Sequence, residues 1–187
     1  KSIESLGSDG KMIIYSKMQS DAYPTLLIWG DSHAGMLNFG IGNDKFNIIK
    51  LITSGCPSLL ETVRRDSTGN STNCNEVIDG KIVQDYIAKI SPDVVVIVNR
   101  YNLYLYGWRK KNKLQDANHY LYTHGSKDSS FLSRAIAIES GLSKSIEFIN
   151  SIDAKAVLVK PFPSIAHLGS SKELILKGIK KIPSNKD

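Results

Sequence analysis

The sequence predicts an α/β domain in which helices cover both faces of a parallel sheet. Short apolar runs, typical of buried strands, alternate along the chain with longer segments whose apolar residues recur at helical spacing. Most of these runs end at turn-forming residues such as Gly, Pro or Asn. Strands and helices that alternate in this way form parallel sheets, because each crossover helix returns the chain to the starting edge.

Length and composition are consistent with one folded domain. The chain has 187 residues, of which 41% are hydrophobic and 22% charged, so it can bury a core without metals or many disulfides. The longest apolar run, Val94–Val98, is far shorter than the roughly 20 residues of a membrane-spanning helix. We expect residues 1–24 to be a lead-in or linker and residues 25–187 to form the domain.

Four strands are predicted. The clearest is continuous, apolar and rich in β-branched residues, which favour the pleated conformation. The strands cover residues 25–29, 46–53, 93–99 and 155–159.

The segments between these strands predict helices and two irregular regions. One helix opens at Ser32, and two longer helices carry apolar stripes over residues 75–90 and 129–150. The polar residues 61–75 predict a loop. Residues 100–128 are aromatic and basic and predict a long, partly helical excursion. Its aromatic rings either stack against sugars or pack over the sheet.

Three of the predicted strands end in residues suited to acyl transfer. The first ends in Gly30-Asp31-Ser32-His33, the second in Ser54-Gly55 and the third in Asn99. The carboxyl ends of parallel strands lie at one edge of a sheet, so these residues can converge. Ser32 offers a hydroxyl nucleophile. The backbone N–H groups of Ser32 and Gly55 and the amide of Asn99 are candidate donors to a developing oxyanion.

The two neighbours of Ser32 are expected to have supporting roles. Asp31 is read as a hydrogen-bond acceptor that fixes the turn, and His33 as a structural or substrate-side residue, since adjacent residues on a turn usually point apart. A nucleotide-binding domain with an ordinary strand-end turn is the alternative for the whole set. No glycine-rich phosphate-binding loop supports that alternative.

The first turn resembles the first sequence block of the SGNH (GDSL-like) hydrolase superfamily, whose serine nucleophile corresponds to Ser32. Gly55 and Asn99 resemble the glycine and asparagine of the second and third blocks. The resemblance implies a three-layer αβα sandwich with a parallel sheet, as in flavodoxin-like folds. The first block is carried by the string Leu27-Ile28-Trp29-Gly30-Asp31-Ser32-His33-Ala34.

A narrower resemblance concerns the SGNH domains of membrane acyltransferase-3 proteins, which O-acylate bacterial surface polysaccharides. The run Ser54-Gly55-Cys56-Pro57 with a later Cys74 is similar to that group. It implies an acyl donor and a surface glycan acceptor as partners. It also implies an extracytoplasmic location, with a membrane acyltransferase domain tethering the module from its N-terminal side.

The two cysteines, Cys56 and Cys74, are open to two interpretations from their number alone: a disulfide or two unrelated thiols. The resemblance implies that they form a disulfide. No histidine lies at zinc-ligand spacing from them, and no cofactor is expected. The net charge of +6 is moderate, and its densest cluster, Arg109-Lys110-Lys111, is expected to be a solvated loop, so no nucleic-acid partner is predicted.

The sequence departs from the family's pattern at the general base. SGNH enzymes carry Asp-x-x-His after the last strand, where the Asp orients the His. Asp116 and His119 have this spacing but precede a predicted helix and strand, while His167 has Ser164 in place of the Asp. We therefore expect the chain to stop before its last strand and its Asp-x-x-His motif, with His119 and Asp116 as the candidates within it.

Taken together, these features predict a serine acyltransferase domain that O-acylates a bacterial surface polysaccharide. A free-standing esterase or lipase of the same superfamily is one alternative. A non-catalytic glycan-binding or structural module that keeps the fold without the base is the other.

Overall fold

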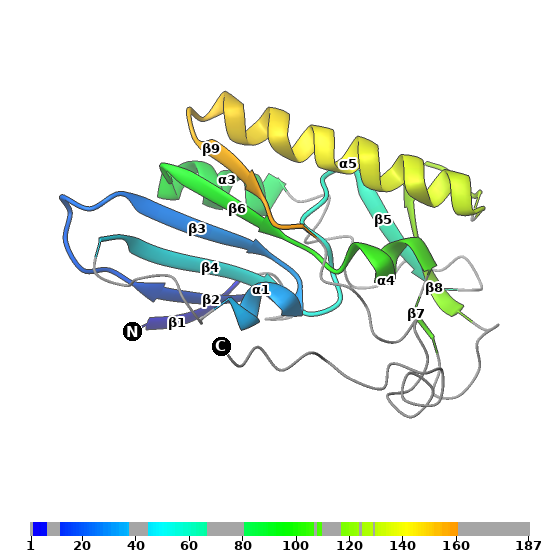
Figure 1. Ribbon diagram of the computed structural model, residues 1–187, viewed down its shortest axis with the longest axis horizontal. Coiled ribbons are helices and arrows are strands. Elements are labelled where there is room, and N and C mark those ends of the chain that lie inside the picture. The colour runs from blue at the N-terminus through cyan, green and yellow to red at the C-terminus, as the bar shows by residue number, and fades with distance from the viewer. Residues whose placement is uncertain are drawn as a thin grey trace, which may run out of the picture.

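A computed structural model describes most of the chain, and Figure 1 shows how its elements are arranged. Six strands form the main sheet in the order β1-β2-β4-β3-β6-β9. The strands are β1 (Ser2–Leu6), β2 (Met12–Lys17), β3 (Thr25–Gly30), β4 (Asn47–Thr53), β6 (Val94–Val98) and β9 (Lys155–Leu158). The described residues are 2–6, 12–37, 45–66, 81–106, 108–109, 117–123, 125–128 and 130–160.

The four predicted strands form the parallel part of the sheet, which confirms the α/β fold class. β3 lies between β4 and β6 and pairs in parallel with both, and β9 pairs in parallel with β6. In β3, Leu27 and Trp29 pack into the core on one face of the sheet, while Leu26 and Ile28 pack on the other. A strand buried on both faces needs a continuous apolar run, which is the pattern that predicted it.

The sheet is mixed rather than purely parallel, because residues 2–6 and 12–17 add two antiparallel strands. β2 pairs with β4, with Ile14 opposite Leu51, and β1 pairs with β2. Residues 1–24, expected to be a lead-in or linker, therefore contribute an edge of the domain's own sheet. Ile14 is buried in the main core, which gives β2 a reason to remain on the sheet.

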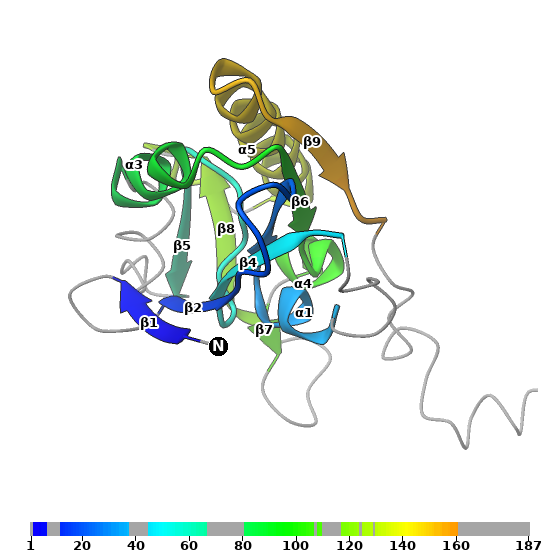
Figure 2. The same ribbon diagram turned by 90° about the vertical axis from the view of Figure 1, so that its left-hand side faces the viewer.

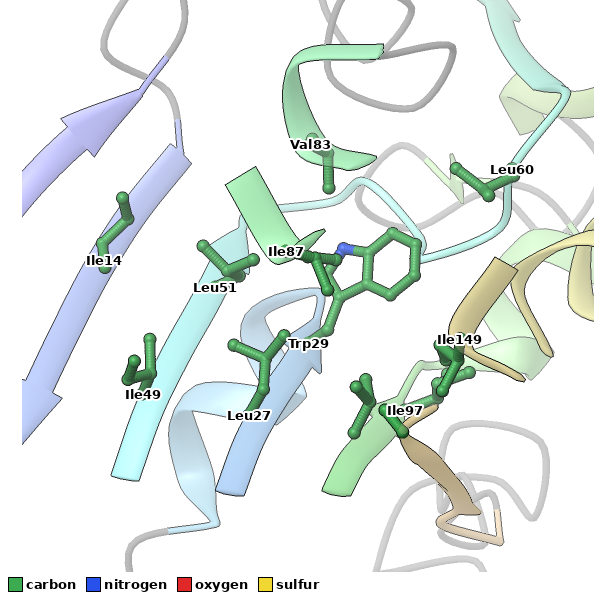
Figure 3. Close-up of a cluster of buried hydrophobic side chains, with 12 residues drawn as sticks. Ile14, Leu27, Trp29, Ile49, Leu51, Leu60, Val83, Ile87, Ile97 and Ile149 are labelled. Carbon is green, nitrogen blue, oxygen red and sulfur yellow. The ribbon is translucent and has the colours of Figure 1, made fainter. Parts of the chain in front are cut away.

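Helices cover the two faces of the sheet unequally. Figure 3 shows the larger core, in which α3 (Lys81–Ile90) and α5 (Phe131–Ser151) cover one face. The short helix α1 (Ser32–Met36) covers the other face and buries Ala34. The helices predicted over 75–90 and 129–150 correspond to α3 and α5. The larger core includes Leu27, Trp29, Leu51, Val83, Ile87, Ile97 and Ile149.

A second, antiparallel sheet lies beyond the carboxyl ends of the parallel strands and beside α5 (Figures 1 and 2). Its order is β5-β8-β7, and its strands arise where a loop and an irregular excursion were expected. Leu121 of this sheet, Leu59 and Tyr104 form a core with Ala137 of α5. The elements are β5 (Thr62–Asp66), α4 (Tyr101–Tyr106), β7 (Trp108–Arg109) and β8 (Ala117–Thr123).

None of the helices in the described part of the chain is long and apolar enough to cross a membrane.

Candidate active site

The ends of β3 and β6 approach each other very closely at Gly30. Gly30 pairs with Val98 of β6 and with Ile52 of β4, so the residues after all three strands meet at one edge. A Cβ atom at Gly30 would lie 1.9 Å from the Val98 carbonyl oxygen, which is closer than any side chain allows. The glycine is therefore required by the backbone contact that brings the two strand ends together.

Ser32 is the first residue of α1 and its side chain is exposed. The preceding Asp31 has an extended backbone and caps the helix, so the chain turns sharply between a buried residue and an exposed one. The Ser32 N–H lies in the first turn of α1, where N–H groups have no acceptor within the helix. A hydroxyl and a backbone donor are thus presented together at the sheet edge.

The Asp31 carboxylate holds this turn against the turn that follows β6. Asp31 is 1% exposed, and its Oδ1 accepts a hydrogen bond of 2.8 Å from the His33 N–H. Its Oδ2 accepts a 2.7 Å bond from the Arg100 N–H and another from the Tyr104 hydroxyl. Asp31 is therefore a hydrogen-bond acceptor that fixes the turn, which is the role the sequence led us to expect.

Burial is the main cause of the shifted pKa values of the groups around Asp31. Burial raises the pKa of the Tyr104 phenol well above its usual value; the Asp31 charge adds to this shift and the Arg64 charge opposes it. Burial likewise raises the pKa of Tyr101 and lowers that of Arg64. Tyr104 thus stays protonated and remains a donor to Asp31.

Asn99, the residue after β6, is buried and bound at both ends of its side-chain amide. Its Oδ1 accepts a 2.9 Å hydrogen bond from the Ser58 N–H, and its Nδ2 donates to the Ser58 hydroxyl, also at 2.9 Å. The hydroxyl of Tyr101 is close enough for Asn99 to lower the pKa of that phenol, but it is not aligned for a hydrogen bond with any described residue.

Gly55 lies in the turn after β4 with a φ of 70°, a left-handed conformation that favours glycine. Its carbonyl accepts a 3.2 Å hydrogen bond from Nη1 of Arg64, a half-buried residue of β5. The next residue, Cys56, is buried and disulfide-bonded. Cys74, the other cysteine of the chain, lies outside the described residues, so its pairing with Cys56 stays a prediction.

The structure does not identify the general base among the histidines. His33 is partly exposed, and its Nδ1 lies 3.4 Å from Asp31 Oδ1 without the alignment of a hydrogen bond. The backbone of His119 lies in β8, opposite Asp66 and Trp108, while Asp116 and His167 lie outside the described residues. The choice of base therefore stays a prediction.

The aromatic excursion mostly packs inward or is covered by arginine. Tyr104 and Tyr122 are buried, and the guanidinium of Arg65 lies 5.6 Å from the Tyr122 ring centroid. Arg134 covers the Tyr120 ring at 4.6 Å. For these rings the structure favours packing over sugar stacking. Tyr106, which contacts the Phe131 ring, keeps an exposed face.

The structure thus brings Ser32, Asn99 and Gly55 to one edge of the sheet, as the strand ends predicted. It adds two residues that the sequence did not identify, Ser58 and Tyr104. Ser58 lies just beyond the Gly-Cys-Pro turn, which was the only available signal for it; Tyr104 is one of eight tyrosines and had none. Within the described ranges no three His, Cys, Asp or Glu side chains gather as metal ligands.

Comparison with known proteins agrees with this geometry. A family model described as "SGNH domain (fused to AT3 domains)" matches residues 6–185, which is nearly the whole chain. No curated protein and no solved structure gives a significant match. The match includes β2 and the parallel strands, together with all the strand ends described above. The chain therefore belongs to the family of SGNH domains that are fused to acyltransferase-3 domains.

Proposed function

We propose that this domain transfers an acyl group through Ser32 to a hydroxyl of a bacterial surface polysaccharide. The observation that carries the proposal is the exposed Ser32 on a turn fixed by the buried Asp31, beside the end of β6. Membership of an acyltransferase-associated family supports the reaction class.

The proposed reaction has two steps at one serine. The Ser32 oxygen attacks the carbonyl carbon of the acyl donor, a base takes the serine proton, and the donor's alcohol or thiol leaves with a proton. The oxygen of an acceptor hydroxyl then attacks the acyl-serine and forms the new ester. The base takes the acceptor's proton and returns it to the Ser32 oxygen as the bond from the acyl carbon to that oxygen breaks. The N–H groups of Ser32 and Gly55 and the Asn99 amide would bind the oxyanion in both steps.

The general base is proposed to be a histidine, with His119 and its neighbour Asp116 as the candidates in this sequence. His119→Ala should lower kcat as strongly as Ser32→Ala if this assignment holds. A His119→Ala protein with the parental kcat would exclude His119 as the general base. It would leave the proposal for Ser32 as nucleophile intact, since the two variants are measured separately.

The setting of the reaction is part of the proposal. The family's fusion to acyltransferase-3 domains supports a partner domain in the membrane that delivers the acyl donor. Acceptors of this kind lie outside the cytoplasm, so we propose an extracytoplasmic site. The disulfide at Cys56 is compatible with that compartment.

The test is hydrolysis of an aryl acetate, in which water replaces the glycan as acceptor. Ser32→Ala should abolish the protein-dependent rate, while Ser151→Ala, which removes an exposed serine hydroxyl at the far end of α5, should keep it. Equal rates for the parent and Ser32→Ala would refute the nucleophile and favour a non-catalytic module. Adding an O-deacylated polysaccharide should divert acyl groups from water to the glycan; unchanged hydrolysis with no glycan ester would favour an esterase.

A further inference from the structure

Ser58 joins three of the strand ends that meet at the candidate active site. Its hydroxyl lies 3.2 Å from the carbonyl oxygen of Trp29 in β3 and 2.9 Å from Nδ2 of Asn99 after β6. Ser58 itself belongs to the segment after β4, and its carbonyl accepts a 3.1 Å bond from the Ser145 hydroxyl of α5. The residue is 1% exposed, so all of these bonds are shielded from water.

Two contacts with Ser58 determine the orientation of the Asn99 side-chain amide. The backbone N–H of Ser58 can only donate, so the Asn99 atom facing it at 2.9 Å must be the oxygen. The amide nitrogen then lies on the other side and donates one of its two hydrogens to the Ser58 hydroxyl. A single residue therefore contacts both ends of the amide. The amide nitrogen carries a second hydrogen besides the one that it donates to Ser58.

We infer that Ser58 is a positioning residue of the acyl-transfer site and that it acts through Asn99. The inference rests on the proposed function, because it takes Asn99 as an oxyanion donor. Donors stabilise a developing charge most when they need no reorientation during the reaction. Without the Ser58 hydroxyl, the amide nitrogen of Asn99 loses a partner. Only the bond from the Ser58 N–H to the amide oxygen then holds the side chain in the position in which it serves the oxyanion.

A double-mutant cycle on the full chain tests this role. In aryl-acetate hydrolysis, Asn99→Ala should lower kcat by about 10²–10³-fold. Ser58→Ala should lower kcat by about 10- to 100-fold with KM nearly unchanged. The double variant should be no slower than Asn99→Ala alone, because Ser58 has no route to the reaction once the amide is gone.

A matched control comes from the same segment. Thr62 is also 1% exposed, and its hydroxyl donates a 2.7 Å bond to the Leu59 carbonyl rather than to Asn99. Thr62→Val removes one buried hydroxyl while keeping the side-chain shape, so any effect it has on kcat should multiply with that of Asn99→Ala. The inference is overturned if Ser58→Ala combines with Asn99→Ala in that same multiplicative way, or if it leaves kcat at the parental value.

A spectroscopic measurement separates this inference from the proposed function. If the parent is no faster than Ser32→Ala, the proposed reaction fails, and the side-chain amide signals of Asn99 decide the Ser58 question. These NMR signals, assigned by their loss in Asn99→Ala, should exchange slowly with water in the parent and at least about tenfold faster in Ser58→Ala, because a buried hydrogen bond has been lost. Unchanged exchange would show that Ser58 does not hold the amide.

Discussion

Replacing Tyr104 by phenylalanine removes the hydroxyl that donates to the Asp31 carboxylate and keeps the ring. That ring packs in the core with Leu59, Leu121 and Ala137 and is fully buried, so the substitution leaves no sizeable cavity. After the change Asp31 keeps two donors, the N–H groups of His33 and Arg100. The variant therefore removes one of the bonds that fix the turn carrying Ser32.

The magnitude follows from the charge of the acceptor. A hydrogen bond to a charged group contributes about 1.5–3 kcal/mol, so we expect the free energy of unfolding to fall by that amount. The urea m-value should not change, because the surface exposed on unfolding is nearly the same. We also expect a lower kcat, since the Ser32 turn loses one of its ties to α4.

Urea unfolding of the parent and the variant measures this difference. Tyr122→Phe is the control, because it removes a hydroxyl from another buried ring that makes no bond to Asp31, and its effect should stay within about 0.5 kcal/mol. A Tyr104→Phe protein as stable as this control would refute the argument that Asp31 depends on Tyr104.

Three further predictions concern stability. Gly30→Ala should destabilise the fold by about 1–3 kcal/mol or more, because the new Cβ would lie 1.9 Å from the Val98 carbonyl oxygen. Gly35→Ala is the control and should change stability by less than about 1 kcal/mol, because its Cβ meets only a flexible side chain at 3.5 Å. Similar urea midpoints for the two variants would contradict this. Reducing the disulfide at Cys56 should cost about 3 kcal/mol, and mass spectrometry of the unreduced protein should find no free thiol. Because the pKa of Tyr104 is raised in the folded protein, the folded protein keeps the phenol proton above a pH of about 10, while the unfolded chain loses it. The free energy of unfolding should therefore fall as the pH rises past that value, and it should fall less steeply in Tyr104→Phe. Equal slopes of this free energy against pH in the two proteins would argue against the raised pKa.

The central strands β3 and β6 were predictable because a strand buried on both faces needs a continuous apolar run. The run Leu26-Leu27-Ile28-Trp29 can be satisfied only by a central strand, and the same holds for Val94–Val98. The antiparallel strands have weaker apolar patterns in the sequence. β2 has one short apolar stretch around Ile14, and β5 has a single apolar residue, Val63, so local pattern alone did not separate either strand from a loop.

In the candidate site, the residues that directly follow strands were predictable, and the residues that support them were not. Ser32, Gly55 and Asn99 come directly after strands, and parallel topology alone brings such positions to one edge. Their supports depend on side-chain contacts between distant positions. Ser58 meets Asn99 across 41 residues and Tyr104 meets Asp31 across 73, and no local pattern in one sequence encodes such pairs.

The most direct test of the central claim is to trap the acyl-enzyme. The full chain is mixed with an aryl acetate and quenched in acid, and its peptides are sequenced by mass spectrometry. We predict an acetyl group on Ser32 that is absent from Ser32→Ala and is lost on adding a polysaccharide acceptor. Continued ester turnover with no acetyl group on Ser32 would contradict the assignment of Ser32 as the nucleophile.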